Sequence, residues 1–479
     1  MKGLNLVKKW RDTPAAAKSS VVFALSSFIL KGISFLTTPV FTRILSPAHY
    51  GVVATYNSWM TIIEVFALLG LTSAGVFNVG LNDYREKRSE FISSILILCN
   101  LFTVSVFAIL FAAQAIVGID FLLPMNLLLV MFIHFIFSPA TVFWVTRQRY
   151  EYKYKAAFCV SVGSAVVSQG LSAICVVLMT DANPAYLKIW SATIATLLFQ
   201  VPIYCMLLIK GKKFADRHIW KSVLIFALPL LPHYLAQHVM LGSDRIMLSK
   251  LYSEAAAGIY SVVSNISVIA TMIWSSVNAS LVPYTFEKLN DKKYGDINRI
   301  VLPLLLAYSV ICVGVTLVAP EIIMILAPKE YYSGVYAVPP IVSVAFLSAL
   351  YNIYANVEFY HKKSGGIAVA TIVSAVVNIA LNLVLIPKFG FVGAAYTTLV
   401  SNIVLIFMHY CNYRRCQKER VYNDKLVFLL AAACLILCGL CNLLYINNIV
   451  RYAVIAVIAI GVIIKHKAII ALIKSLKSR

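Results

Sequence analysis

Charged residues are scarce in this chain of 479 residues, because Asp, Glu, Lys and Arg together make up only 13% of it. A soluble domain carries about 25% charged and roughly 45–50% apolar residues, whereas this chain is 61% hydrophobic. The composition excludes a disordered chain, a collagen-like chain and a small secreted fold held by disulfides. We therefore expect an all-α polytopic membrane protein.

The sequence also lacks the motifs of soluble catalysis. It contains no glycine-rich phosphate-binding loop, no H-E-x-x-H motif and no nucleophile elbow. We therefore expect that the protein is not an enzyme and that it holds no cofactor and no metal ion. None of the ten cysteines falls in a loop on the expected outward side, which is the only oxidising side, so we expect no disulfides.

A membrane-spanning helix needs roughly 20 mainly apolar residues. Fourteen segments of the chain meet this requirement. They are 19–41, 50–73, 91–118, 121–145, 156–179, 186–209, 222–243, 257–281, 297–319, 333–357, 366–387, 391–409, 426–445 and 449–464.

Basic residues divide the connecting loops into two sets. Of the 41 lysines and arginines, 33 lie in the terminal segments and in every second loop, and only seven lie in the alternate loops. Positively charged loops stay on the cytoplasmic side during insertion. We therefore expect both termini in the cytoplasm, which requires an even number of spans. The net charge of +22 then comes from loop residues that determine the topology and lie near anionic lipid headgroups, and it does not indicate nucleic-acid binding.

A weak internal repeat divides the chain into two similar halves. Thr42–Gly51 resembles Ser249–Gly258 at an offset of 207 residues, and three shorter matches follow in order at offsets of 208 to 210. Six spans per half make the two repeats parallel, with a crevice between them, as in a transporter. The expected parts are a cytoplasmic amphipathic N-terminus (1–18), an N-lobe (19–221), a C-lobe (222–425), and a final helix pair with a basic cytoplasmic tail (426–479).

Two charged residues are expected inside the membrane, where a charge costs at least ~2.5 kcal/mol on insertion scales. Lys31 lies near the middle of the first span, and Glu64 lies within the second. At a rise of about 1.5 Å per residue, the two differ in depth by about 6 Å. The functional interpretation is a cation that meets an anionic headgroup and is modulated by Glu64. The structural alternative is an ion pair that fixes helix packing.

Three further basic residues are expected at the outer ends of matching spans in the two halves. Arg43 ends the first span, and Arg245 and Lys250 end the seventh. They either line an outward mouth that binds substrate or form a solvated rim. Asp244, next to Arg245, is expected to neutralise it.

The seventh span contains two prolines among polar side chains. Pro229 and Pro232 each remove a backbone hydrogen bond and predict a kink. Such breaks are tolerated where they line a wet cavity, so this span is a candidate for gating or coupling. His233 and His238, with Gln237 between them, are candidates for proton coupling because the pKa of an unperturbed histidine is about 6.5. The alternative for both histidines is a packing role.

Two stretches resemble a known family. Thr42–Val52 resembles the R-x-L-x-P-x-x-Y-G segment between helices one and two of polysaccharide-biosynthesis flippases, and Asp244–Leu248 with Ala257–Tyr260 resembles the segment after helix seven. Length, repeat and number of spans are similar to those of the Wzx-type O-antigen and exopolysaccharide flippases. These belong to the multidrug/oligosaccharidyl-lipid/polysaccharide exporter superfamily. The resemblance implies two MATE-like lobes of six helices and a C-terminal helix pair.

The resemblance also implies a substrate, an undecaprenyl-diphosphate-linked oligosaccharide that is flipped from the cytoplasmic to the periplasmic leaflet of a bacterial inner membrane. Its sugars and diphosphate cannot cross ~30 Å of hydrocarbon unaided. Lys31 lies on helix one, where relatives of the lipid II flippase branch carry a cavity arginine. Membrane lipids, the polysaccharide polymerase and a chain-length regulator are the implied partners.

Several alternatives stay open. A multidrug cation antiporter or a lipid II flippase would have the same fold, and a membrane polymerase or acyltransferase would belong to another class. The energy source is equally open among a proton gradient, a sodium gradient, the membrane potential and consumption of the product by a polymerase.

Overall fold

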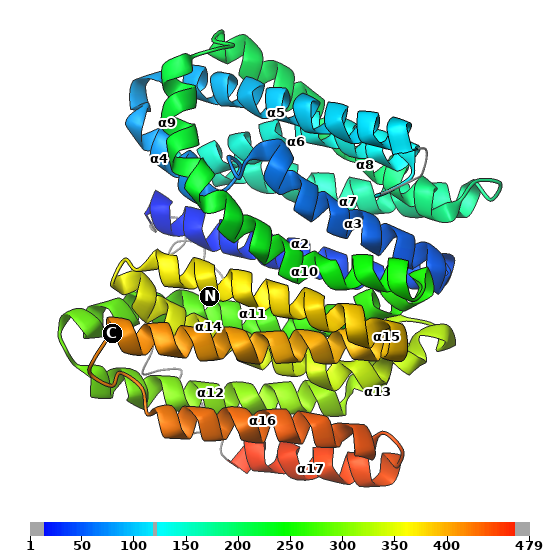
Figure 1. Ribbon diagram of the computed structural model, residues 1–479, viewed down its shortest axis with the longest axis vertical. Helices are drawn as coiled ribbons and strands as arrows, with labels where there is room; N and C mark the ends of the chain where they lie inside the picture. The colour runs from blue at the N-terminus through cyan, green and yellow to red at the C-terminus, as the bar shows by residue number, and fades with distance from the viewer. Residues whose placement is uncertain (1–13, 118–121, 465–479) are drawn as a thin grey trace, which may run out of the picture. The chain divides into compact units, whose positions relative to one another are not determined.

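The computed structural model describes residues 14–117 and 122–464, and every regular element in them is helical. The chain forms two compact units, Met1–His238 and Val239–Arg479 (Figure 1). The division falls inside helix α10, Leu231–Leu251. Most of the expected N-terminal segment 1–18, and the end of the expected basic tail from 465 onward, lie outside the described residues.

The first unit contains helices joined mostly by short turns. In chain order its elements are α2 (Ala15–Ile44), α3 (Pro47–Leu68), α4 (Ala74–Asp83), the 3-10 turn η1 (Arg85–Lys87), α5 (Arg88–Val117), α6 (Met125–Tyr150), α7 (Tyr154–Leu178), α8 (Pro184–Gly211), α9 (Arg217–Ala227), η2 (Leu228–Leu230) and the start of α10.

The second unit begins within α10 and has a similar succession of helices. Its further elements are α11 (Glu254–Asn290), α12 (Tyr294–Leu317), α13 (Ala319–Leu326), η3 (Lys329–Ala337), α14 (Val338–Tyr360), α15 (Ser364–Cys416), α16 (Asp424–Leu444) and α17 (Asn448–Ile464).

Twelve helices in the described part of the chain are long and apolar enough to cross a membrane, so the protein is a multi-pass membrane protein. The expected count of fourteen spans is not confirmed. The segments 366–387 and 391–409 both lie within the element α15, which counts as one of the twelve although the chain reverses between them at Gly390. The last expected span, 449–464, corresponds to α17, which has an apolar stretch of only Asn448–Gly461.

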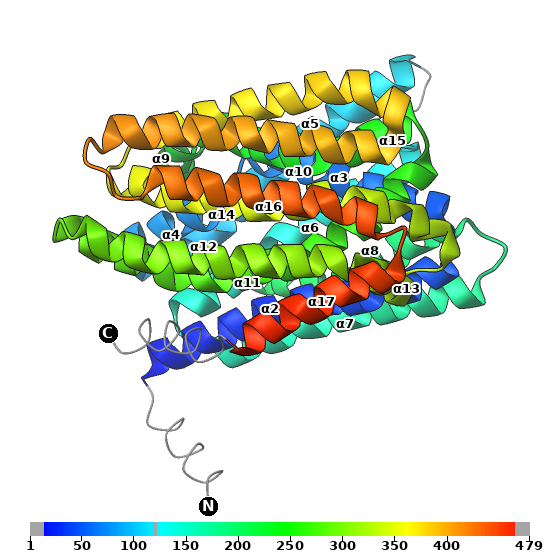
Figure 2. The same cartoon turned by 90° about the horizontal axis from the view of Figure 1, so that it is seen from below.

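Helix α15 has 53 residues, and a straight helix of that length would measure about 80 Å. The chain instead folds back at Gly390, where φ is 55° and ψ is −136°. The Asn378 amide donates a hydrogen bond to the Thr398 hydroxyl at 3.3 Å, although 20 residues separate them. The two halves of α15 therefore lie side by side as a helical hairpin (Figures 1 and 2).

The repeated sequence segment forms the same kind of corner in both units. Ser46 precedes α3 and accepts a hydrogen bond from the His49 amide at 3.2 Å. Ser253, 207 positions later, precedes α11 and accepts one from the Ala256 amide at 3.1 Å. A serine oxygen at this position satisfies an amide that the first helical turn leaves unpaired. The repeat therefore marks where a new helix begins in each unit.

Aromatic packing holds the interior of the first unit. The rings of Phe77 and Phe143 stack with their centroids 4.5 Å apart, and Phe91 is fully buried beside them. Large apolar side chains such as Ile109 and Ile116 remain exposed on the outside. Such a surface is suited to lipid tails, because lipid does not penalise exposed apolar groups as water does.

Candidate functional site

Helix α2 has two exposed rows of different chemistry. One row is apolar and contains Val21, Leu25, Phe28, Leu36 and Val40. The other consists of small or polar residues at spacings of three and four, namely Ala24, Ser27, Lys31 and Ser34. Residues at these spacings share one helical face. Lys31 therefore lies on the polar face of α2 and not on the apolar face.

The polar row leads to a cavity of about 380 Å³ at the end of α6. The cavity is lined by Ser19, Phe23, Ala24, Ser27, Arg149 and Tyr152. The guanidinium carbon of Arg149 lies 4.7 Å from the centre of the Phe23 ring, within the range of a cation–π contact. Lys31 lies one helical turn beyond Ser27 on the same face. The structure thus places a second cation, Arg149, near the polar row, although the sequence indicated Arg149 only as a topology determinant.

Glu64 is half-buried on α3, and its Oε1 accepts a long hydrogen bond of 3.5 Å from the Thr72 hydroxyl. Within the described residues, no ion pair joins Glu64 to Lys31. The structural alternative for these two residues, a packing ion pair, is therefore not formed in this conformation. Whether Lys31 and Glu64 bind substrate stays a prediction.

The seventh expected span is interrupted. Helix α9 ends at Ala227, the 3-10 turn η2 contains Pro229, and α10 begins at Leu231. Pro229 and Pro232 are both exposed at this break. The three polar candidates that follow on α10 are half-buried, namely His233, Gln237 and His238.

The break contacts the turn that follows α3. The Tyr234 hydroxyl donates a hydrogen bond to the Ser73 hydroxyl at 3.2 Å. Its ring packs on Gly70, where a Cβ atom would lie only 2.9 Å away. Thr72, which bonds Glu64, belongs to the same turn. Thr72, Ser73 and Gly70 therefore connect Glu64 to Tyr234 of the interrupted helix. No sequence pattern indicated this connection.

The basic residues expected at an outer mouth lie near helix ends. The guanidinium groups of Arg43 and Arg245 each donate to a carbonyl four positions earlier, in both cases at 2.8 Å. Arg245 also donates to the Ser261 hydroxyl at 3.0 Å. Lys250 is exposed in the last turn of α10. Arg43 and Lys250 lie in the last turn of their helices, where a cation is favourable, so these positions suit a rim as well as a binding site.

A buried polar cluster in the second unit was missed by the sequence analysis. The Asp244 side chain is only 3% exposed. Its Oδ2 accepts hydrogen bonds from the Tyr260 and Thr398 hydroxyls, both at 2.6 Å. Its Oδ1 accepts from the Asn382 amide at 2.7 Å, and Asn382 in turn donates to Asn378 at 3.2 Å. The cluster joins α10, α11 and both arms of α15.

The three donors to Asp244 are neutral side chains, so they solvate a negative charge without cancelling it. A buried ionised carboxylate is costly unless it is paired or neutralised. Carboxylate, amide and hydroxyl oxygens are also the ligands that hard cations prefer. The cluster therefore offers a small hard cation a set of oxygen ligands around Asp244.

The fold belongs to a class of membrane transporters. The solved structure of "Lipid II flippase MurJ, inward closed conformation" matches with a TM-score of 0.67 and 14% identity, over 94% of this chain and 100% of that one. An inward-facing MATE family transporter of the MOP superfamily matches with a TM-score of 0.60 and 13% identity, over 83% and 98%. At these identities the likeness concerns the fold alone.

The chain itself belongs to the polysaccharide biosynthesis protein family, which residues 16–289 match. "Lsg locus putative protein 1" of Haemophilus influenzae is 22% identical over 196 residues, which are 38% of this chain and 49% of that protein. The match thus spans about half the length of this curated relative. The expected family resemblance and the expected all-α, MATE-like fold are confirmed.

Proposed function

We propose that this protein flips an undecaprenyl-diphosphate-linked oligosaccharide from the cytoplasmic to the periplasmic leaflet of a bacterial inner membrane. The observation that carries the proposal is Lys31, an exposed cation on the polar row of an apolar helix, one turn beyond the cavity of Arg149. Charged residues in membrane helices face a protein interior or a wet cavity, because lipid does not solvate them. Family membership adds support for a polysaccharide precursor as cargo.

The chemistry of α2 suits an anionic headgroup. A diphosphate loses most of its hydration when it leaves water, and nearby cations offset that loss more strongly in a low dielectric. Lys31 offers three donors on a flexible stem and Arg149 offers a planar fork, so both can follow a moving phosphate. Ser27 and Ser34, on either side of Lys31 along the helix, provide hydroxyls for sugar groups.

The positive charge at the polar row of α2 favours a flippase over a multidrug cation antiporter of the same fold. A cationic drug would need carboxylates at the polar row, whereas the row carries Lys31 and leads to Arg149. Glu64 is half-buried and accepts a hydrogen bond from Thr72. A lipid II flippase would use the same cations and would differ only in its sugars.

We further propose that the interrupted helix around Pro229 and Pro232 moves during transport. Three half-buried polar side chains on α10, His233, Gln237 and His238, would then change surroundings as it moves. Protonation of the histidines or occupation of the Asp244 cluster would supply the driving force. Arg43, Arg245 and Lys250 are proposed to meet the headgroup at the outer end of its path.

Replacing Lys31 tests the proposal. In a strain that depends on this protein, we expect Lys31→Ala to abolish surface polysaccharide, because the headgroup then lacks its intramembrane cation. Lys31→Arg should retain most export, because the charge remains. Arg149→Ala should reduce export. The measurement is surface polysaccharide on gels, normalised to the amount of protein in the membrane.

Lys363→Ala provides a matched control, since it removes an exposed lysine from the second unit and should leave export unchanged. Full export by Lys31→Ala at normal protein level would overturn the headgroup role. Purified protein in vesicles containing the lipid-linked oligosaccharide, lipid II or a cationic dye separates the three transport alternatives. Movement of the dye alone would favour the antiporter.

A further inference from the structure

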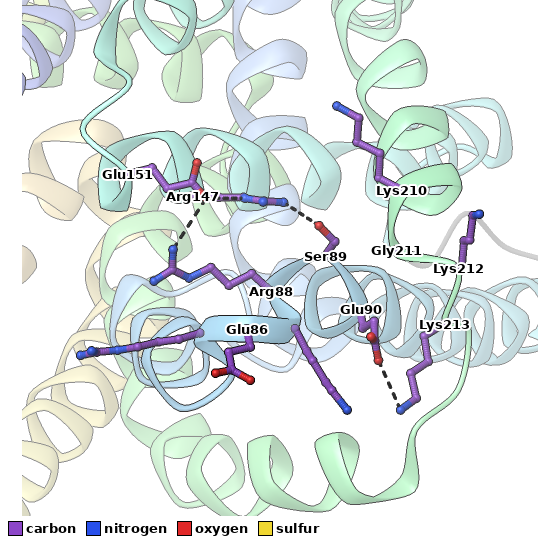
Figure 3. A pocket seen from close by; sticks show the side chains of 12 residues that line it. Glu86, Arg88, Ser89, Glu90, Arg147, Glu151, Lys210, Gly211, Lys212 and Lys213 are labelled. Carbon is purple, nitrogen blue, oxygen red and sulfur yellow. Dashed lines mark hydrogen bonds and ion pairs between the residues drawn. The ribbon is translucent and has the colours of Figure 1, made fainter.

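A second cavity in the first unit, of about 570 Å³, is formed by three segments that lie far apart in the sequence (Figure 3). These segments are Arg85–Glu90 before and at the start of α5, Arg147 and Glu151 at the end of α6, and Lys210–Lys213 at the end of α8. Seven of the lining residues are Lys or Arg and three are Glu. The cavity therefore has an excess of positive charge, and it shares no lining residue with the cavity of Arg149.

Two of the acidic residues in this cavity are already paired. Glu151 accepts hydrogen bonds from Arg147 and Lys153, both at 2.8 Å. Burial alone would raise the pKa of Glu151, but the hydrogen bonds and the positive charges of Lys153 and Arg147 together lower it. Glu90 lies 3.6 Å from the Lys213 ammonium. These carboxylates therefore do not neutralise the remaining cations.

Lys213 is engaged twice, because it also lies 2.7 Å from Asp216. Asp216 caps α9 by accepting from the amides of His218 and Ile219 at 2.8 and 3.2 Å. The hydrogen bond from Lys213, together with these amides, lowers the pKa of Asp216 to about 2. Asp216 therefore remains charged at neutral pH and orders the segment that follows Lys213.

Three lysines of the cavity are not paired with any carboxylate among the described residues. Lys87, Lys210 and Lys212 are exposed and make no ion pair or hydrogen bond to any residue that the structure describes. In Figure 3, no dashed line reaches Lys210 or Lys212. Like charges gathered around one cavity repel each other, and an anion in the cavity relieves that repulsion.

The frame that carries these lysines is closely packed. Gly211 lies directly on α5, since a Cβ atom there would meet the Ser93 hydroxyl at 2.1 Å and the Ser89 carbonyl at 2.5 Å. The Ser93 hydroxyl donates to the Lys213 carbonyl at 2.9 Å. Arg147 donates to the Ser89 hydroxyl at 3.1 Å and so ties α6 to the same turn of α5. The backbone segments that carry these lysines are therefore held in fixed positions by direct contacts between α5, α6 and the end of α8.

We propose that this cavity binds the phosphate of an anionic ligand, with the headgroup of an anionic membrane phospholipid as the favoured source. Its lining residues lie at the ends of three candidate spans, Arg85–Val117, Met125–Tyr150 and Pro184–Gly211, which is the depth at which headgroups lie. Lysine and arginine are the side chains that bind phosphate in proteins. The volume falls within the range of about 300–1,000 Å³ typical of ligand pockets. The proposal does not depend on which substrate the protein transports.

The test compares two triple variants of the full-length protein purified in a non-ionic detergent. The pocket variant carries Lys87→Gln, Lys210→Gln and Lys212→Gln. The control variant carries Lys362→Gln, Lys363→Gln and Lys418→Gln, which remove three exposed lysines from the second unit. Native mass spectrometry counts bound phosphatidylglycerol and phosphatidylcholine, and thermal unfolding with added pyrophosphate tests a soluble source of phosphate.

We expect phosphatidylglycerol to bind in preference to phosphatidylcholine, and the pocket variant alone to lose at least about tenfold in affinity. Stabilisation by pyrophosphate that disappears only in the pocket variant, without a phosphatidylglycerol preference, would support the same site with a soluble ligand. Equal losses in both variants would mean diffuse attraction to charge and would overturn the proposal. Binding of both ligands that is unchanged in the pocket variant, or no binding at all, would also overturn it.

Discussion

Asp244 is a charge carried by a membrane helix and solvated by three neutral donors. Removing its side chain would leave the hydroxyls of Tyr260 and Thr398 without their acceptor, whereas the Asn382 amide would keep its hydrogen bond to Asn378. Each unsatisfied buried group costs about 1–3 kcal/mol. We therefore expect Asp244→Ala to destabilise the second unit by roughly 2–4 kcal/mol. Thermal unfolding of the purified protein in detergent measures the loss.

Asp244→Asn separates the charge from the shape at this position. The amide fills the same space, so most of the stability should remain, but a neutral amide cannot hold a cation as a carboxylate does. If the cluster supplies the driving force, this variant should fold and lose gradient-dependent transport. An Asp244→Ala protein as stable as the native one would show that the hydrogen bonds contribute little.

Other ionisable residues are also buried, and their partners are distant in the sequence. Glu358 and His409 are both fully buried and lie 2.7 Å apart, although they are 51 positions apart in the chain. Arg451, counted among the seven basic residues of the alternate loops, is buried and donates to Glu321. Hydropathy places a residue on a helix or a loop, but it does not indicate the partner that makes burial of a charge tolerable.

The hairpin of α15 depends on one backbone conformation. At Gly390, φ is 55° and ψ is −136°, a region that side chains with a Cβ rarely adopt, and a Cβ atom would also lie 3.0 Å from the Tyr252 ring. We expect Gly390→Ala to destabilise the protein by about 1–3 kcal/mol. Thermal unfolding of the purified variant checks this expectation.

Gly365→Ala is the matched control, because it lies in the first turn of the same helix and a Cβ atom there meets nothing within 4 Å. This variant should be neutral or slightly stabilising, since alanine favours helix by up to about 1 kcal/mol over glycine. Equal effects of the two substitutions would contradict the role assigned to the turn.

The two-unit organisation makes a prediction about the topology of the whole molecule. Reporter fusions should place both chain ends and the loop at Lys213 in the cytoplasm, and the loop at Asp181 in the periplasm. The physical reason is the retention of basic loops on the cytoplasmic side, since Lys210, Lys212 and Lys213 lie together at the end of α8. Chain ends on opposite sides would require an odd number of spans and would contradict the expected topology, and a periplasmic loop at Lys213 would remove the parallel relation of the two halves.

At this scale, the sequence predicted much of the architecture. Apolar length indicates a membrane helix almost directly, because the bilayer excludes unpaired backbone groups. Pro229 and Pro232 predicted the break in the seventh span, and the repeated segment, which indicated two similar halves, forms matching corners at Ser46 and Ser253. The predicted break between 366–387 and 391–409 coincides with the reversal at Gly390, whereas the last predicted span, 449–464, corresponds to a shorter apolar stretch, Asn448–Gly461.

Composition and periodicity by themselves determined that the chain is a helical membrane protein, and they singled out Lys31 as an intramembrane cation. Only the tertiary structure decided that Lys31 lies on a polar row leading to Arg149, that Asp244 is held by Tyr260, Asn382 and Thr398, and that three distant segments share one basic cavity. Membrane insertion responds to local hydropathy and charge. A binding site instead requires side chains from distant helices to come into contact, and no local sequence pattern specifies those contacts.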